Sequence, residues 1–282
     1  MIWYSKYLQV YNKAFQATST SIIEEVRGKL REMNSDSPLV SVVIIAHNEE
    51  TRILACIWSL CDNSIDFPIE IMAINNNSTD RTVDVLNQTG IRWFNEEKKG
   101  PGHARQCGLN HARGKYYLCI DADTLYPPHY IKTHVKELMK TGIVCTFGLW
   151  SFIPSENQSP TALRLYEFLR DIHLRIQSIK RPELCVRGMN FGFSSDIAKQ
   201  IGFRTDIKRG EDGSLALSLK KYGKLRFLTT RKVRVFTSNS TLNADGSLTN
   251  SYKLRILKAI KNFTGLFKSK SSYKDDDSNL IK

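Results

Sequence analysis

Apolar runs of strand length alternate with amphipathic stretches of helix length from about Leu39 onward. The first run, residues 39–46, is almost continuous and rich in β-branched side chains, as in a strand buried on both faces of a sheet. Alternation of this kind is typical of a parallel sheet covered by helices. The sequence therefore predicts an α/β fold with a mainly parallel, Rossmann-like sheet flanked by helices.

The same pattern places the other elements. Further strands are predicted over residues 69–74, 91–94, 116–120, 224–228 and 232–236. Helices are predicted over residues 50–61, from 78, from 101, over 162–179 and over 211–222. Pro101 lies where the first turn of a helix tolerates a proline, which supports the helix start there.

Two extensions flank this domain, which is expected to span residues 39–237. Four apolar residues before it share one helical face: Ile22, Ile23, Val26 and Leu30. Residues 1–38 are therefore predicted to form a helical extension that packs against the domain. Residues 238–282 are predicted to form a loop, a basic amphipathic helix over 252–268 and a disordered tail.

Charge and cysteine content narrow the function classes. The 282 residues carry a formal net charge of +13, and residues 203–270 hold sixteen Lys or Arg against four acids. A neutral body with one basic surface favours anionic partners such as nucleotide phosphates or acidic lipid, and no nucleic acid is expected. The six cysteines form no C-x-x-C pair and are expected to be buried thiols in a reducing compartment. With no signal peptide and no apolar run of spanning length, a cytoplasmic location is expected.

Asp121 and Asp123 directly follow the apolar strand predicted over residues 116–120. Ligands of open α/β sheets bind at the carboxyl ends of the strands, and two carboxylates there can share a divalent cation. The alternative is helix capping ahead of Pro127.

Glu211 and Asp212 form a second acidic pair at the start of a predicted helix. A carboxylate at the mouth of a site can act as a general base. Acids in a first helical turn also commonly serve as caps, and that alternative stays open at this point.

Polar residues at two further turns suit a nucleotide. Asn75, Asn76 and Asn77 follow the second strand, where their amides could bind a base or ribose. The loop around Gly100 and Arg105, at the start of a helix, resembles an anion cradle, although it matches no phosphate-loop or dinucleotide pattern.

Taken in order, five segments resemble the landmarks of family-2 glycosyltransferases with the GT-A fold. They are residues 41–50, 74–80, 100–108, 121–123 and 210–212. The resemblance implies an inverting transfer of a sugar from a UDP- or GDP-linked donor to an acceptor hydroxyl, as in the synthesis of cell-surface polysaccharide or glycolipid.

The resemblance also implies roles for individual residues. Asp212 matches the catalytic base and Glu211 a helper beside it. The residues that match nucleotide-binding positions are Ala46, Asn48, Glu49, Asn76, Arg105, Asp121 and Asp123. Asp123, with Asp121, matches the ligand of Mn²⁺ or Mg²⁺, and the loop Gly188, Met189 and Asn190 borders the donor sugar and acceptor.

Some features remain open at the level of sequence. The second landmark carries Asn75 and Asn76 where the family often has aspartates, and a third metal ligand is not identified. A nucleotidyltransferase, or a noncatalytic nucleotide-binding protein on the same fold, is the alternative. The basic helix over 252–268 suits contact with an anionic membrane and a lipid-linked acceptor, or else packs on the domain with its charges in water.

Overall fold

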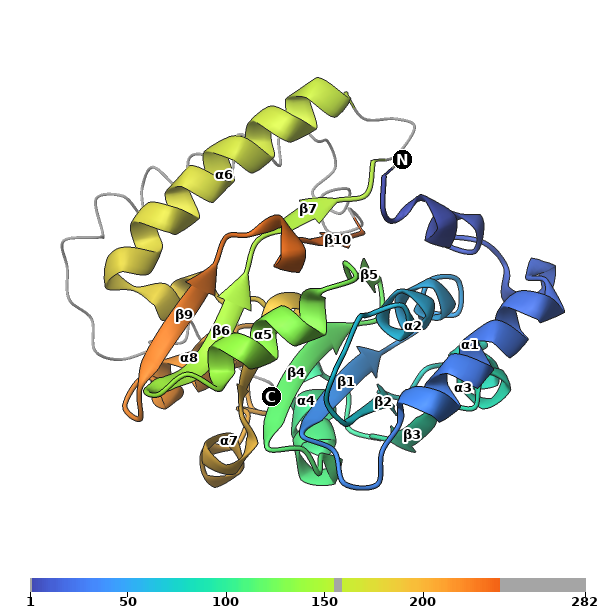
Figure 1. The fold of residues 1–282 in the computed structure, drawn as a ribbon, viewed down its shortest axis with the longest axis horizontal. Coiled ribbons are helices and arrows are strands. Elements are labelled where there is room, and N and C mark those ends of the chain that lie inside the picture. The colour runs from blue at the N-terminus through green and yellow to red at the C-terminus, as the bar shows by residue number, and fades with distance from the viewer. Residues whose placement is uncertain (1, 155–158, 239–282) are drawn as a thin grey trace.

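A seven-stranded sheet forms the centre of the computed structural model, which describes residues 2–154 and 159–238 (Figure 1). Its strand order is β3-β2-β1-β4-β8-β6-β9. The strands are β1 (Val40–Ala46), β2 (Ile69–Asn75), β3 (Arg92–Asn95), β4 (Tyr116–Asp121), β6 (Ile143–Gly148), β8 (Phe191–Ser194) and β9 (Lys224–Leu228). β8 runs antiparallel to both of its neighbours, and the other pairings are parallel. This mostly parallel sheet confirms the predicted α/β class.

Helices lie on both sides of the sheet, and several bury an apolar face against its strands. They are α1 (Thr20–Met33), α2 (Ile53–Cys61), α3 (Thr82–Thr89), α4 (Pro101–His111), α5 (Tyr130–Leu138), α6 (Pro160–Lys180), α7 (Ser195–Ile201) and α8 (Glu211–Leu219). α4 packs on β1 and β2, and α5 contacts β4, β8 and β6. Among the described residues no helix is long and apolar enough to cross a membrane.

A small second sheet lies beside the first, in the order β5-β10-β7. It consists of β5 (Thr124–Leu125), β10 (Val235–Thr237) and β7 (Trp150–Phe152). β5 directly follows the Asp121–Asp123 turn, and β10 brings the end of the described chain next to it. The second sheet thus fixes the region just beyond the carboxyl end of β4.

The N-terminal extension packs as predicted. Ile23, Val26 and Leu30 of α1 are buried, and α1 contacts α2, α3 and β2. Two short 3₁₀ turns, Ser5–Gln9 and Phe15–Ala17, precede it. The predicted helix over 252–268 and the predicted tail lie outside the described residues. All six cysteines are free and buried, as expected.

The sequence pattern misses six helices and strands: α5, β5, β6, β7, β8 and α7. It also assigns residues 232–236 to one strand, whereas the structure has a 3₁₀ turn over Arg231–Val233 before β10. Five of the missed elements, β5, β6, β7, β8 and α7, have at most seven residues. Elements this short are stabilised by their neighbours rather than by a periodic pattern of their own.

Candidate active site

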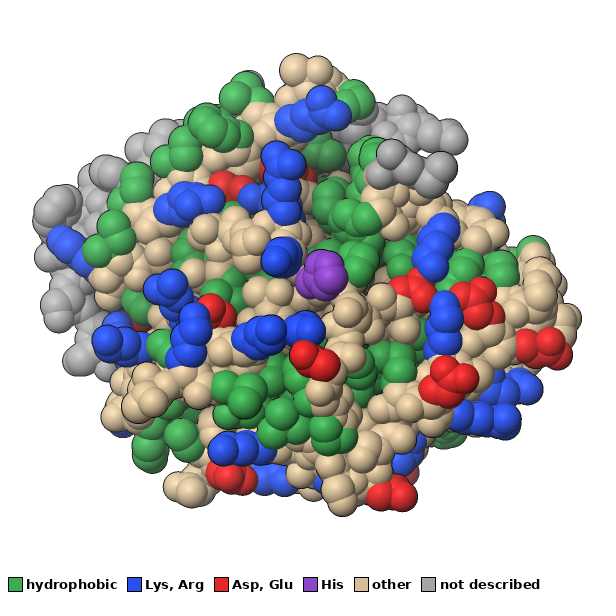
Figure 2. Space-filling view, in the orientation of Figure 1, with side chains coloured by type: hydrophobic (Ala, Val, Ile, Leu, Met, Phe, Trp, Pro, Cys, Tyr) green, Lys and Arg blue, Asp and Glu red, His purple; other side chains and the backbone are tan. Residues whose placement is uncertain are grey.

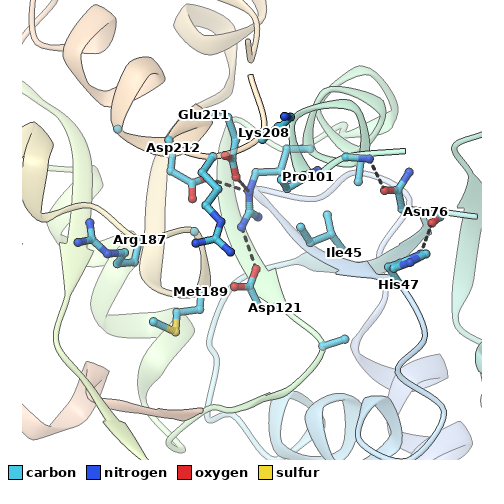
Figure 3. Close-up of a pocket in the computed structure, with 18 of the residues that line it drawn as sticks. Ile45, His47, Asn76, Pro101, Asp121, Arg187, Met189, Lys208, Glu211 and Asp212 are labelled. Carbon is cyan, nitrogen blue, oxygen red and sulfur yellow. Dashed lines mark hydrogen bonds and ion pairs between the residues drawn. The ribbon is translucent and has the colours of Figure 1, made fainter. Parts of the chain in front are cut away.

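A pocket of about 1050 Å³ opens at the carboxyl ends of β1, β2 and β4. The strand ends, with the start of α4, form one wall, which we call the donor wall (pocket residues within 45–123). Residues 183–189 and 208–213 form the other, which we call the acceptor wall. In Figure 3, Arg187 and Met189 lie on one side of Asp121, and His47 and Asn76 lie on the other.

Arg105 joins the two acidic pairs across this pocket. Its Nη2 atom donates to Asp121 Oδ1 at 2.8 Å, and its Nε atom lies 2.8 Å from Asp212 Oδ1. The side chain is only 3% exposed. A guanidinium buried this deeply requires anionic partners, and the carboxylates supply them. Its Nη1 atom is also buried and makes no hydrogen bond within the described part of the chain.

Gly188 permits the contact between Arg105 and Asp212. A Cβ atom on Gly188 would lie 1.7 Å from Arg105 Nη2 and 2.6 Å from Asp212 Oδ2. The backbone amide of Gly188 also acts to lower the pKa of Asp212. A residue without a side chain is therefore required for the acceptor wall to close onto the arginine.

The Tyr126 hydroxyl ties the same loop to the donor wall. It accepts from the backbone N–H of Asp121 at 3.0 Å and donates to the carbonyl of Met189 at 3.0 Å. One buried hydroxyl thus fixes the end of β4 against the loop that carries Gly188.

Asp123 is held by hydroxyls from three segments. Its Oδ1 atom accepts from Thr124 at 3.1 Å and from Thr237 of β10 at 3.3 Å. Its backbone carbonyl accepts from the Tyr11 hydroxyl at 2.8 Å and from the N–H of Ser238 at 3.2 Å. The N-terminal extension and β10 therefore both position this aspartate.

Burial and like charges raise the pKa values of three carboxyl groups in the pocket. Burial, opposed by Arg105 and supported by Glu211 and Asp121, raises the pKa of Asp212 to about 7. Burial and the neighbouring Asp121 raise the pKa of Asp123 to about 6. Burial and Asp123 raise the pKa of Glu49 to about 8, against the opposing effect of Arg52, whose Nε atom lies 2.8 Å from Glu49 Oε2. The pocket concentrates negative charge that a cation would relieve.

The carboxylates of the pocket suit a divalent cation whose remaining coordination positions are filled by the substrate. Among residues 2–154 and 159–238, no three His, Cys, Asp or Glu side chains are grouped closely enough to hold a metal ion. Mg²⁺ is commonly bound by one or two carboxylates together with substrate phosphates, so a full protein cage is not required. The crowded carboxylates of Asp121 and Asp123 have the hard oxygen ligands that Mg²⁺ and Mn²⁺ prefer.

Most of the residues predicted from sequence line this one pocket. They are Ala46, Glu49, Asn76, Arg105, Asp121, Asp123, Gly188, Met189, Glu211 and Asp212. Asn76 lines the pocket, but its polar groups are engaged within the protein: Oδ1 accepts from Gly100 N–H at 2.9 Å and Nδ2 donates to the carbonyls of Glu96 and Lys98, while its backbone N–H donates to the carbonyl of Ala46 and its own carbonyl lies 2.7 Å from His47 Nδ1.

Two predicted residues lie outside the pocket lining. Asn48, with φ of +57°, caps the turn before α3, and its Oδ1 accepts from Thr79 N–H at 2.8 Å. Asn190 is fully buried: Oδ1 lies 2.9 Å from His134 Nε2, and Nδ2 donates to the carbonyls of Leu149 and Val233. The structure therefore places neither residue in the pocket where nucleotide and sugar binding were expected of them: the Asn48 Oδ1 atom and both polar atoms of the Asn190 side chain bond within the protein.

Several pocket residues were not selected by sequence reasoning. Arg187, Lys208 and Arg209 add positive charge around the acids. The sequence signal that could have identified them is their position next to the landmark segments. Tyr11, Tyr126 and Thr237 give no comparable sign, because their contacts join segments far apart along the chain.

Residues 41–202, more than half of the chain, match the sequence model of Glycosyl transferase family 2. The chain belongs to this family. A protein of Haemophilus influenzae named as an uncharacterized glycosyltransferase is 26% identical over 125 residues, which cover 42% of this chain and 50% of that protein. The 4,4'-diaponeurosporenoate glycosyltransferase of Staphylococcus aureus is 27% identical over 138 residues, covering 45% and 35%. The chain spans about a third to a half of the curated relatives that it matches.

Solved structures show the same fold. The mannosyltransferase PcManGT of Pyrobaculum calidifontis, in complex with GDP-Man and Mn²⁺, superposes with a TM-score of 0.56 at 15% identity, covering 94% of this chain and 80% of that one. Glucosyl-3-phosphoglycerate synthase of Mycobacterium tuberculosis gives a TM-score of 0.52 at 18% identity, covering 87% and 85%. These likenesses confirm the expected GT-A fold.

Proposed function

We propose that this chain transfers a sugar from a nucleoside-diphosphate donor, UDP- or GDP-linked, to an acceptor hydroxyl with inversion at the anomeric carbon. The observation that carries the proposal is the convergence of Asp121 and Asp123 with Glu211 and Asp212 around the buried Arg105 in one pocket. Helix capping alone gives no reason for two acidic pairs to meet. Membership of the family and the solved complexes with UDP-Glc and GDP-Man support the donor class.

Asp212 is the general base of the proposed reaction. Its carboxylate removes the proton of the acceptor hydroxyl while that oxygen attacks the anomeric carbon, and the diphosphate departs with the electron pair of the broken bond. A pKa of about 7 places the base near neutral pH, where general bases are most effective. Glu211 lies beside it, with Oε1 3.5 Å from Arg105 Nε, and helps to set the charge around the base.

The donor wall binds the nucleotide diphosphate. Lys99 and the start of α4 provide positive charge and backbone N–H groups where the diphosphate would lie. Asp123, with Asp121 beside it, would hold Mn²⁺ or Mg²⁺, which supplies further positive charge to the leaving group when bound. Sequence resemblance suggested direct contact between Arg105 and the diphosphate. In the structure, Nη2 and Nε of Arg105 are engaged with carboxylates, and Nη1 is buried.

A thermal-shift panel tests the donor site. UDP, GDP, CDP and TDP and their sugar conjugates are each added with Mn²⁺ or with EDTA, since a ligand at a hundred times its Kd adds about 2.7 kcal/mol of stability. We expect UDP or GDP to stabilise the protein only with metal, and Asp123→Ala to abolish that shift. No shift with any nucleotide under either condition would overturn the proposal.

Product analysis separates the two alternative functions. A nucleotidyltransferase would consume a nucleoside triphosphate and release pyrophosphate, whereas the proposed enzyme releases a nucleoside diphosphate. A noncatalytic nucleotide-binding protein would behave in the same way with and without the Asp212→Asn substitution.

The acceptor and the location belong to the same proposal: synthesis of a cell-surface polysaccharide or glycolipid at the inner face of the cell membrane, with a lipid-linked acceptor. The basic segment 252–268, a candidate membrane contact, lies outside the described residues.

A further inference from the structure

α6 presents an apolar stripe to solvent. Of the nine large hydrophobic side chains that are exposed among the described residues, six lie on this helix: Leu165, Phe168, Leu169, Ile172, Ile176 and Ile179. At 100° per residue they fall within an arc of roughly 100°. Figure 2 shows them as a band of hydrophobic side chains along the upper-left edge of the molecule, over α6. A row this long is unusual on the surface of a soluble domain and marks an interaction site.

The opposite face of α6 is bound to the domain and takes up the acids of the helix. Glu167 accepts from Ser151 Oγ at 2.8 Å and from the N–H of Phe152 at 2.7 Å. Asp171 pairs with Arg170 at 2.9 Å and with Arg234. Both carboxylates of α6 are therefore turned toward the domain and engaged there by hydrogen bonds or ion pairs.

The exposed charged side chains of α6 are positive. Arg164, Arg175 and Lys180 are exposed, and they flank the apolar stripe on its two sides. An amphipathic helix with Phe and Leu on one face and Lys or Arg beside it binds in the interface of an anionic bilayer. The negative surface of anionic lipid attracts cationic side chains that lie close to it.

We infer that the exposed face of α6 docks on an anionic lipid bilayer. A second copy of the chain fits less well, because pairing two such faces would bring like charges together. The segment 252–268 of the same chain also fits less well, because it too is basic, with Lys253, Arg255, Lys258 and Lys261. α6 leads into the 3₁₀ turn Pro182–Cys185 and the acceptor wall, so a bilayer at α6 would deliver a membrane-held acceptor to the pocket. The docking itself does not depend on the proposed transferase activity.

Site-directed labelling tests this surface directly, because all six native cysteines are buried. Phe168→Cys and Met139→Cys place a polarity-sensitive dye at positions of matched exposure, 61% and 60%, on α6 and at the end of α5. The full-length chain is mixed with vesicles of phosphatidylcholine, with or without phosphatidylglycerol. We expect a blue shift for the dye at 168 only with the anionic vesicles, and no shift for the dye at 139.

Vesicle flotation of the full-length chain adds a binding measurement. Phe168→Ser with Ile172→Ser should weaken binding about tenfold or more, since apolar burial drives insertion, and so should Arg164→Glu with Arg175→Glu. Met139→Ser with Tyr222→Ser removes a similar exposed apolar area elsewhere and should bind as the unaltered chain does. Unchanged flotation of both α6 variants would overturn the inference in favour of another anchor. A dimer that the α6 variants convert to monomer, without vesicle binding, would assign the stripe to a second copy.

Discussion

The two walls of the pocket are held in place by different means. The donor wall lies at the ends of hydrogen-bonded parallel strands, where Ala46 is in register with Asn75 and Ile45 with Asp121. The acceptor wall consists of turns and the first residues of α8, and it meets the donor wall through the Arg105 ion pairs, Gly188 and the Tyr126 hydroxyl.

This difference indicates how each wall should respond to mutation. A strand end is positioned by many backbone hydrogen bonds, so one side-chain change there alters binding without moving the wall. The acceptor wall depends on a few polar contacts, so one change can displace the base itself. Mutations in the acceptor wall should therefore have the larger effect on the rate of the chemical step. Mutations in the donor wall should have the larger effect on the affinity for the sugar donor.

Asp212→Asn should give the largest effect and separate the two walls most clearly. Without the base, kcat should fall about 10²- to 10⁴-fold, whereas the metal-dependent thermal shift with nucleotide should persist. Steady-state kinetics and thermal shift are measured on the same preparation. Asp206→Asn changes an exposed aspartate on the same segment and serves as the control. Loss of nucleotide binding in Asp212→Asn would show that the walls do not act separately.

Gly188→Ala tests whether the acceptor wall is set by close approach. The new Cβ would overlap Arg105 Nη2 and Asp212 Oδ2, and a displacement of about 1 Å at a reacting group can cost about 10²-fold in rate. Donor binding should change little.

Gly28→Ala is the matched control for that substitution. A Cβ at Gly28, within α1, meets nothing within 4 Å. This change should leave kcat unaltered and stabilise the protein by about 1 kcal/mol, as alanine does in a helix interior. Full activity in Gly188→Ala would contradict the proposed role of the glycine.

With metal and sugar donor at saturating concentrations, the pH dependence of kcat should follow the ionisation of Asp212 on the acceptor wall. Because Asp212 must be ionised to accept a proton and its pKa is about 7, the rate should rise with pH through 7, and at pH 6 it should be about a tenth of its plateau. Glu211 raises the pKa of Asp212, so Glu211→Gln should shift this limb to lower pH. If the rise in rate occurs at the same pH in Glu211→Gln, Glu211 does not influence the pKa of Asp212.

The contrast between the walls also explains how far the sequence could be interpreted. The strands β1, β2 and β4 were predicted to within one or two residues, because each is a buried apolar run that ends in polar residues. β8, which separates β4 from β6, has four residues and runs against its neighbours. Its formation depends on those neighbours, and no local pattern expresses that.

The same distinction holds for the site. Asp121 and Asp123 could be assigned from residue type and position at a strand end. The bridge that Arg105 makes to Asp212, the need for glycine at 188 and the burial of Asn190 arise only when distant segments meet. For this reason the sequence predicted which residues gather at the pocket better than it predicted what each one contacts.

Tyr11→Phe should give the smallest effect, and it tests the donor wall from the N-terminal extension. Removing the hydroxyl that donates to the Asp123 carbonyl should cost about 1 kcal/mol of stability and weaken metal-dependent nucleotide binding severalfold, with kcat at saturation unchanged. Tyr7→Phe is the matched control, because Tyr7 is a buried tyrosine of the same extension whose hydroxyl donates to Asp62 at 2.7 Å, outside the pocket lining. Both variants should lose similar stability in chemical denaturation. Only Tyr11→Phe should lose nucleotide affinity, and equal nucleotide titrations for the two would mean that the extension stabilises the fold without positioning Asp123.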